Sequence, residues 1–134
     1  MTATVNLSTL TRRRLVSVTV AQYIYRDDAP EVTDVWLHLE HLTIGVDVGA
    51  DWSFRITPAE PGQGYTMDDL GARVEIVPAP GTVPFARYVG ELLVGVEAWF
   101  DPDDPSDGVG AEFAFESGSV LAKSFGGELH LDLG

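Results

Sequence analysis

The chain has 134 residues, no cysteine and a formal net charge of −13, from 21 acidic and eight basic residues. A chain of this length predicts a single domain, residues 1–134, with a sizeable core. The lack of cysteine excludes disulfides, thiolate metal sites and a cysteine nucleophile. No apolar run is long enough to cross a membrane and no signal pattern opens the sequence, so we expect a cytoplasmic protein with no membrane partner.

Charge is distributed unevenly along the chain. The first 26 residues carry four arginines and no acid, and the remainder carries four bases and 21 acids, a net charge of −17. Such a field repels nucleic acid and attracts cationic partners, so we expect a basic protein partner and no nucleic acid. The alternative is that high acidity only keeps a small protein soluble.

The first half of the chain predicts short strands. Residues 1–7 lack periodicity and are expected to form a frayed tail. The buried parity changes at Glu40-His41, which predicts a bulge or tight turn there. Prolines and glycines predict a long irregular loop at residues 57–70, with one helical turn at most near its end. The strands expected in this half are 15–26, 35–40, 42–48, 52–56 and 74–76.

The C-terminal part predicts a meander of antiparallel strands. Alternating residues indicate strands on both sides of an acidic loop at 101–108, and Ser117-Gly118 predicts a two-residue hairpin turn. That turn would pair Phe115 with Val120, Phe113 with Ala122 and Glu112 with Lys123. One shared core is expected from Leu92, Val94, Val96, Phe113, Phe115, Val120, Leu129, Leu131 and Leu133.

About eight to ten strands and no helix longer than two turns predict an all-β, single-domain, mostly antiparallel fold. We expect a strongly bent sheet that forms a barrel or a two-layer sandwich. Several aromatic residues fall on the parity opposite the main apolar rows. In such a fold a core position is favoured for them over an exposed binding surface. These residues are Tyr23, Tyr25, Trp36, Trp52 and Trp99.

No motif predicts catalysis, a metal or a cofactor. The acids of residues 101–107 do not have the spacing of a calcium loop, and two prolines restrict that segment. His38, Glu40 and His41 do not have a zinc spacing, and we expect these to be surface or interface histidines near a strand kink. No serine has the sequence of a nucleophile turn. We therefore expect no cofactor and no enzymatic activity.

Three stretches carry a family resemblance: Gly90–Val96, Ala111–Gly118 and Glu128–Leu131. A strand that begins near a glycine, a Phe-x-Ser-Gly hairpin and a Glu-Leu-x-Leu end resemble small uncharacterised bacterial domains. Some of these are similar to immunity proteins of toxin systems. The resemblance covers the C-terminal third of the chain and implies an acidic protein that blocks a basic toxin.

The sequence therefore favours an acidic protein-binding module of the immunity type. The partner-binding residues expected are Trp99, Asp101, Asp103, Asp104 and Asp107, because carboxylates steer a basic partner and aromatics supply affinity. The alternative function is a small β-barrel that binds an apolar ligand beneath the loop at 57–70. Self-association through the last strand, residues 129–133, is a further alternative.

Overall fold

The computed structural model describes residues 7–134, apart from the side chains of residues 105–107. Within this part of the chain no helix reaches seven residues and strands dominate, so the all-β prediction is confirmed. None of these helices is long and apolar enough to cross a membrane. Of the frayed tail predicted at residues 1–7, residues 1–6 lie outside the described residues. Leu7 belongs to a short helix and packs against the core, so the prediction is wrong for Leu7.

The described residues form ten strands and three short 3-10 helices. The strands are β1 (Arg13–Tyr25), β2 (Glu31–Leu39), β3 (Leu42–Val48), β4 (Phe54–Pro58), β5 (Tyr65–Met67), β6 (Ala72–Pro78), β7 (Leu92–Asp101), β8 (Asp104–Phe115), β9 (Ser119–Phe125) and β10 (Glu128–Leu133). The helices are η1 (Leu7–Thr9), η2 (Asp68–Leu70) and η3 (Pro84–Tyr88).

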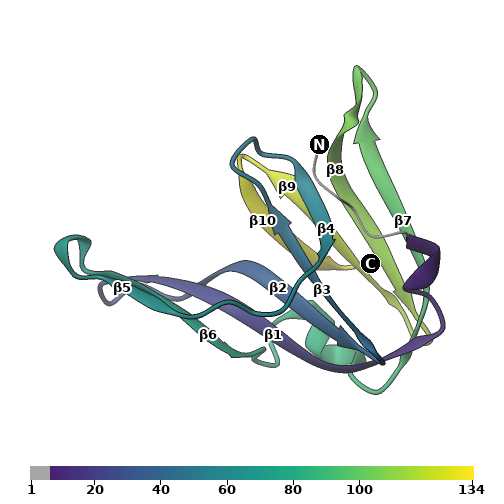
Figure 1. Cartoon of the computed structure of the whole chain (residues 1–134), viewed down its shortest axis with the longest axis horizontal. Helices are drawn as coiled ribbons and strands as arrows, with labels where there is room; N and C mark the ends of the chain where they lie inside the picture. The colour runs from purple at the N-terminus through teal and green to yellow at the C-terminus, as the bar shows by residue number, and fades with distance from the viewer. Residues whose placement is uncertain (1–6) are drawn as a thin grey trace.

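All ten strands belong to one antiparallel sheet with the path β10-β9-β8-β7-β1-β2-β3-β4, and β6 and β5 branch from β1. β2 lies along one edge of β1, while the other edge pairs first with β7 and then with β6. The two branches diverge, so the β7–β8 hairpin projects away from the wing formed by β5, β6 and the end of β1 (Figure 1). The sheet does not close, so the barrel alternative is wrong, and the expected division into two layers is not confirmed.

One apolar core lies between the diverging branches. η3 follows β6 and places Phe85 and Tyr88 in this core. The Phe85 ring meets that of Phe113 edge to face at 5.2 Å, and Tyr88 stacks on Phe115 at 4.8 Å. Edge-to-face and stacked aromatic pairs add stability beyond the area they bury. The predicted burial of Phe113, Phe115 and Val120 is confirmed.

The strand β7 contains a bulge that the alternating pattern does not reveal. Leu93 pairs with Phe115 and Gly95 pairs with Ala114, so Val94 is the extra residue between them. A bulge reverses which face the following residues occupy. Leu93 is therefore fully buried, whereas Val94 is 54% exposed, and its prediction as a core residue is wrong.

Further core predictions hold only in part. Val96, Leu129 and Leu131 are partly buried and pack against the core. Leu92 is half-buried. Leu133 is 49% exposed, because it lies on β10, the last strand of the sheet, beside the chain end.

The β8–β9 hairpin differs from its predicted register. Val120 pairs with Phe113 and Lys123 pairs with Gly110, so each β9 residue meets a β8 residue two positions earlier than predicted. A shift of two keeps every side chain on its predicted face. The cause is the turn: Phe115 N donates to Gly118 O (2.7 Å), which leaves residues 116–117 as the loop.

Gly118 was predicted to be part of the hairpin turn, but in the structure it allows close packing of Tyr88. A Cβ at this position would stand 2.5 Å from the Tyr88 hydroxyl oxygen, so only glycine fits beneath that ring. Gly118 does not have a positive φ, in contrast to Gly126 and Gly127 in the β9–β10 turn.

The turns of the first half follow the sequence more closely. Leu39 pairs with Leu42, and His41 has a φ of 61°, so the predicted tight turn at Glu40-His41 is confirmed. The predicted loop at 57–70 is only partly irregular, because β4 extends to Pro58 and β5 and η2 occupy residues 65–70. The helical turn expected near its end is η2.

Candidate functional site

The predicted acidic loop is the end of the β7–β8 hairpin. Strand pairing continues to Asp101 and Asp104, which leaves Pro102 and Asp103 at the turn. Asp103 N donates to Asp101 Oδ1 (2.8 Å), a local contact typical of aspartate in turns. The prediction of an acidic loop at 101–108 is therefore wrong in its length, because strand pairing satisfies backbone groups that a loop would leave to water.

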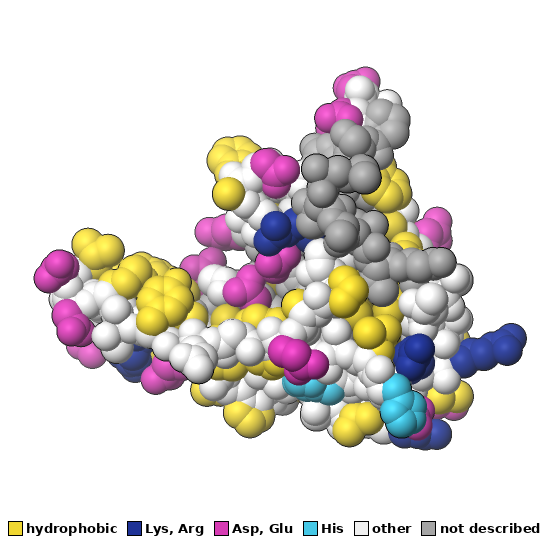
Figure 2. Space-filling view, in the orientation of Figure 1, with side chains coloured by type: hydrophobic (Ala, Val, Ile, Leu, Met, Phe, Trp, Pro, Cys, Tyr) yellow, Lys and Arg dark blue, Asp and Glu magenta, His cyan; other side chains and the backbone are white. Residues whose placement is uncertain are grey.

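The carboxylates of this hairpin face solvent. Asp103 and Asp104 are exposed and Asp101 is half-buried. Asp101 and Asp103 form no ion pair with any residue whose side chain the structure describes. Acidic side chains gather at the far end of the hairpin (Figure 2). The side chain of Asp107, the fourth predicted acid, lies outside the described residues.

A small apolar pocket opens between β4 and the β7–β8 hairpin. Its volume is about 120 Å³, and its lining is Leu7, Phe54, Ile56, Ala98, Trp99, Phe100, Gly108 and Gly110. The two glycines permit this close approach of the strands. A Cβ on Gly108 would stand 2.7 Å from Phe54 O of β4, whereas one on Gly110 would stand 2.6 Å from Ala122 O of β9, so Gly108 allows the approach of β4 and Gly110 that of β9.

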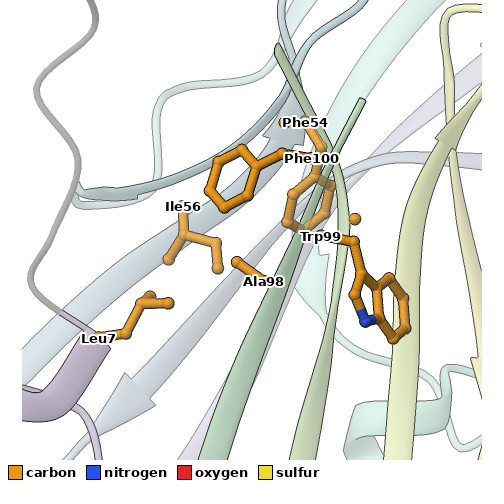
Figure 3. Close-up of a pocket in the computed structure, with 8 residues that line it drawn as sticks. Leu7, Phe54, Ile56, Ala98, Trp99 and Phe100 are labelled. Carbon is orange, nitrogen blue, oxygen red and sulfur yellow. The ribbon is translucent and has the colours of Figure 1, made fainter. Parts of the chain in front are cut away.

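Phe100 and Trp99 both border the pocket, but their rings lie on opposite sides of β7. The Phe100 ring lies with Leu7 and Ile56 on one side of β7, while the Trp99 indole points to the other side (Figure 3). Phe100 is 54% exposed and Trp99 is half-buried. Register shifts on both sides of Phe100 interrupt the regular alternation of β7 just before Asp101. The expected role of Trp99 beside the acids in partner binding stays a prediction.

Two further aromatic residues stand on neighbouring turns. Trp52, in the β3–β4 turn, is 66% exposed and has a φ of 68°. Phe125, at the β9–β10 turn, is 69% exposed. Ser124 Oγ donates to Trp52 O (2.7 Å), and a Cβ on Gly127 would stand 3.1 Å from Trp52 Nε1. The two turns therefore contact each other.

The turns at 49–53, 100–104 and 124–127 rise on the same side of the molecule, and we call them the hairpin end (Figure 1). Each presents one strongly exposed aromatic residue: Trp52, Phe100 or Phe125. Sequence reasoning missed Trp52 and Phe125 as surface residues. Gly49 before Trp52 and Gly126-Gly127 after Phe125 are the signals that place both on turns.

The other aromatic residues on the outer parity have mixed positions. Trp36 is buried, so the core prediction is confirmed for it. A Cβ on Gly45 would stand 3.5 Å from the Trp36 ring, which therefore lies over this glycine. Tyr23 is half-buried and Tyr25 is 38% exposed, so neither is a full core residue.

Two acids near the hairpin end accept hydrogen bonds, Asp47 on β3 and Asp51 in the β3–β4 turn, and Asp34 on β2 is half-buried. Arg55 donates to both carboxylate oxygens of Asp47, at 3.1 and 2.9 Å. Burial raises the pKa of Asp34, the Asp47 carboxylate adds to this rise, and Arg55 opposes it. A hydrogen bond from Ser53 N lowers the pKa of Asp51 in the β3–β4 turn.

The histidines do not form a reactive cluster. His38 has Thr19 Oγ1 at 2.8 Å from Nε2 and Thr43 Oγ1 at 3.1 Å from Nδ1, so both ring nitrogens are engaged. Glu40 accepts instead from Arg14 N (2.8 Å), which directs it away from His38. In the described part of the chain, no group of three or more histidines and acids is arranged to hold a metal ion.

No family model, curated protein or solved structure matches this chain. The resemblance of the C-terminal third to immunity proteins therefore remains an expectation. Function is inferred below from the geometry and charge of the hairpin end.

Proposed function

We propose that this chain is an acidic protein-binding module whose hairpin end binds a basic protein partner. The observation that carries the proposal is the combination of solvent-facing carboxylates with three strongly exposed aromatic side chains on turns that rise on the same side of the molecule. Buried aromatic residues dominate the affinity of protein interfaces, and complementary charge speeds association and selects the partner.

The charge of the chain supports a cationic partner. Residues 27–134 carry a net charge of −17, and within this acidic part Asp101 and Asp103, beside Phe100, form no ion pair with any side chain that the structure describes. Exposed acids of this kind contribute little to folding, because solvent screens them. They steer a basic surface toward the hairpin end, and the aromatic side chains then hold it.

The most specific form of the proposal is an immunity-type protein that neutralises a basic toxin by binding, without catalysis. The resemblance of the C-terminal third supports this form. The small-ligand alternative has weaker support. The sheet is open, and the pocket beside β4 has about 120 Å³ against the ~300–1,000 Å³ of typical ligand pockets. Two larger hollows of about 590 Å³ each, at residues 62–66 and at residues 58–60, lie open to solvent and do not enclose a ligand.

The test uses a variant of the hairpin and a variant of equal charge elsewhere. Asp101→Asn/Asp103→Asn/Asp104→Asn removes three charges from the hairpin end, and Asp27→Asn/Asp28→Asn/Glu31→Gln removes three exposed charges from the opposite wing. Partners are captured from native lysate at low and high salt, with the product of the neighbouring gene supplied as well. The affinity of each purified partner is then measured for both variants.

We expect a basic partner that high salt releases and that binds the hairpin variant at least tenfold more weakly than the wing variant. Equal loss in the two variants would show that only net charge matters and would refute the assignment to the hairpin end. A chain that captures nothing, including the neighbouring gene product, would contradict the proposed function.

Self-association is measured in the same preparation. β10 is the end strand of the sheet, and an unpaired edge can join a second copy across a two-fold axis. Light scattering that gives a stable dimer, lost in Leu131→Lys, would support the alternative of a homodimer formed through residues 129–133. A monomer agrees with the proposed function.

A further inference from the structure

We infer that the pocket between β4 and the β7–β8 hairpin receives one large apolar side chain of the basic partner, from a segment that carries lysine or arginine beside it. This inference rests on the proposed function, because it names what the hairpin end recognises. The occupant is thus a short stretch of protein in which leucine or a similar residue is flanked by cations.

The size of the pocket fits one side chain. Its volume of about 120 Å³ exceeds that of a water molecule several-fold, since water occupies ~30 Å³ in the liquid. It is close to the ~150 Å³ at which an apolar cavity accommodates a benzene-sized group. A drug-sized ligand or a cofactor does not fit.

The lining of the pocket selects an apolar occupant. Ile56 and Phe54 from β4, Ala98 and Phe100 from β7, and Leu7 from η1 supply its side chains. An uncharged, non-polar group loses no hydrogen bonds when it enters such a site, whereas a polar group does. Phe100 is still half exposed at the pocket, so an entering side chain would bury part of its ring.

The surroundings of the pocket select cations next to that apolar residue. Asp101 follows Phe100 directly, and Asp103 and Asp104 complete the turn beyond it. On the β4 side, Arg55 is held by both oxygens of Asp47, so its charge is already balanced. A segment with acids beside the apolar residue would be repelled, and one with lysine or arginine would be attracted.

The test titrates the full chain with blocked pentapeptides Lys-Lys-X-Lys-Lys, in which X is leucine, alanine or serine. Backbone amide shifts are followed by NMR at low and high salt. We expect the leucine peptide to bind about fifteenfold to sixtyfold more tightly than the alanine peptide, because leucine buries two to three more carbon groups and each contributes ~0.8 kcal/mol. The largest shifts should fall on Ile56, Ala98 and Phe100.

Two variants change the pocket in opposite directions. Ala98→Leu fills it, so the preference for leucine over alanine should disappear while salt-sensitive binding of the lysines remains. Leu7→Ala enlarges it, so a phenylalanine peptide should gain relative to the leucine peptide. Circular dichroism and thermal unfolding show whether each variant folds. If Ala98→Leu does not fold, Leu7→Ala alone still tests the inference.

The outcomes separate this inference from the proposed function. Peptide binding that depends on Asp101 and Asp103 but shows no preference for leucine overturns the inference and leaves the proposed function in place. Binding that is insensitive to Asp101→Asn/Asp103→Asn contradicts the proposed function itself.

Two other occupants would also overturn the inference. A leucine preference that appears only after residues 1–6 are deleted would assign the pocket to the chain's own N-terminal residues. A dimer in light scattering that Ala98→Leu disrupts would assign it to a second copy of the chain.

Discussion

The two ends of the β7–β8 hairpin use their acidic residues in opposite ways. At the end near η3, which we call the closed end, Glu91 accepts from Ser117 N and Oγ, both at 2.8 Å, and Glu116 accepts from Leu92 N at 2.8 Å. At the hairpin end, Asp101 and Asp103 form no ion pair with any described side chain. The carboxylates at the closed end therefore link the two strands of the hairpin, whereas at the hairpin end Asp101 binds an N–H of its own turn and Asp103 remains exposed.

The basic residues show the same division. Arg13 donates to Thr9 O and Glu40 O, both at 2.6 Å, and Arg14 donates to Gly90 O. These arginines bind carbonyl oxygens near the closed end, where strands β1 and β7 meet. Net charge therefore predicts a partner only when the charged side chains that bind the backbone are left out of the count.

The largest expected effect contrasts two phenylalanines of the same sheet. Phe113→Ala in the core should lower the free energy of unfolding by roughly 3–5 kcal/mol, because Phe113 is fully buried and its removal leaves a cavity. Phe125→Ala at the hairpin end should change it by less than about 0.5 kcal/mol. Denaturant unfolding of both variants measures the difference, and similar losses would contradict the contrast.

The next effect tests the packing of Gly118 at the closed end. Gly118→Ala should cost roughly 1–3 kcal/mol, because its Cβ would stand 2.5 Å from the Tyr88 hydroxyl, and the Tyr88 ring is fixed by stacking on Phe115. The cost should fall when the substitution is made in Tyr88→Phe, which lacks that oxygen. A double-mutant cycle measures this coupling, and additive costs would show that Gly118 serves the turn itself.

A smaller effect compares carboxylates at the two ends. Glu91→Ala should cost about 1–2 kcal/mol, because Ser117 N and Oγ lose a charged acceptor. Asp103→Ala should stay within about 0.5 kcal/mol, since this exposed acid has no ion pair with a described side chain. Thermal unfolding of Glu91→Ala and Asp103→Ala at low salt measures the two losses of stability. Equal losses would contradict the distinction between the ends.

The smallest expected effect is a pair of opposite pH dependences near the hairpin end. Because burial raises the pKa of Asp34, the folded chain binds this proton more tightly than the unfolded chain. The free energy of unfolding therefore falls as the pH rises from 3.8 through the raised pKa. Asp34→Asn should then stabilise the protein at neutral pH and have less effect at pH 3.8.

Asp51 should show the reverse sign. The hydrogen bond from Ser53 N lowers its pKa, so its contribution is present above pH 3.8 and is lost as the pH falls through the lowered pKa. Asp51→Asn should be slightly destabilising at neutral pH. Equilibrium unfolding of both variants across this range checks the signs, and a shared sign would refute the two electrostatic causes.

Much of the fold could be predicted from local pattern. Alternation of apolar residues predicted the long strands and the burial of Phe113 and Phe115, and the parity change at Glu40-His41 predicted a turn. The bulge at Val94 could not be predicted, because it depends on how β7 meets β8. The predicted register of β9 was wrong for a similar reason. Gly118 packs against the hydroxyl of Tyr88, a residue 30 positions away in the sequence, and is not part of the two-residue turn.

Of the candidate site, only the acidic residues could be predicted from the sequence. Asp101, Asp103 and Asp104 appeared as an acidic segment between two strands, and the structure places them on a hairpin. The pocket could not be predicted, because Leu7, Phe54 and Phe100 come together only when the sheet bends. The contact between the turns of Trp52 and Phe125 likewise joins segments about 70 residues apart.

The branching of the sheet at β1 also determines the order in which the strands can pair while the chain is being synthesised. β1 (Arg13–Tyr25) can pair early with β2. Its other edge stays unpaired until β6 (Ala72–Pro78) and then β7 (Leu92–Asp101) have been synthesised. Pairings between segments this far apart form slowly, because long loops must close first. A nascent chain that ends before residue 92 therefore holds a β1 with part of one edge bare, and unpaired edges recruit other chains. Aggregation during expression should accordingly depend on how quickly the C-terminal strands emerge.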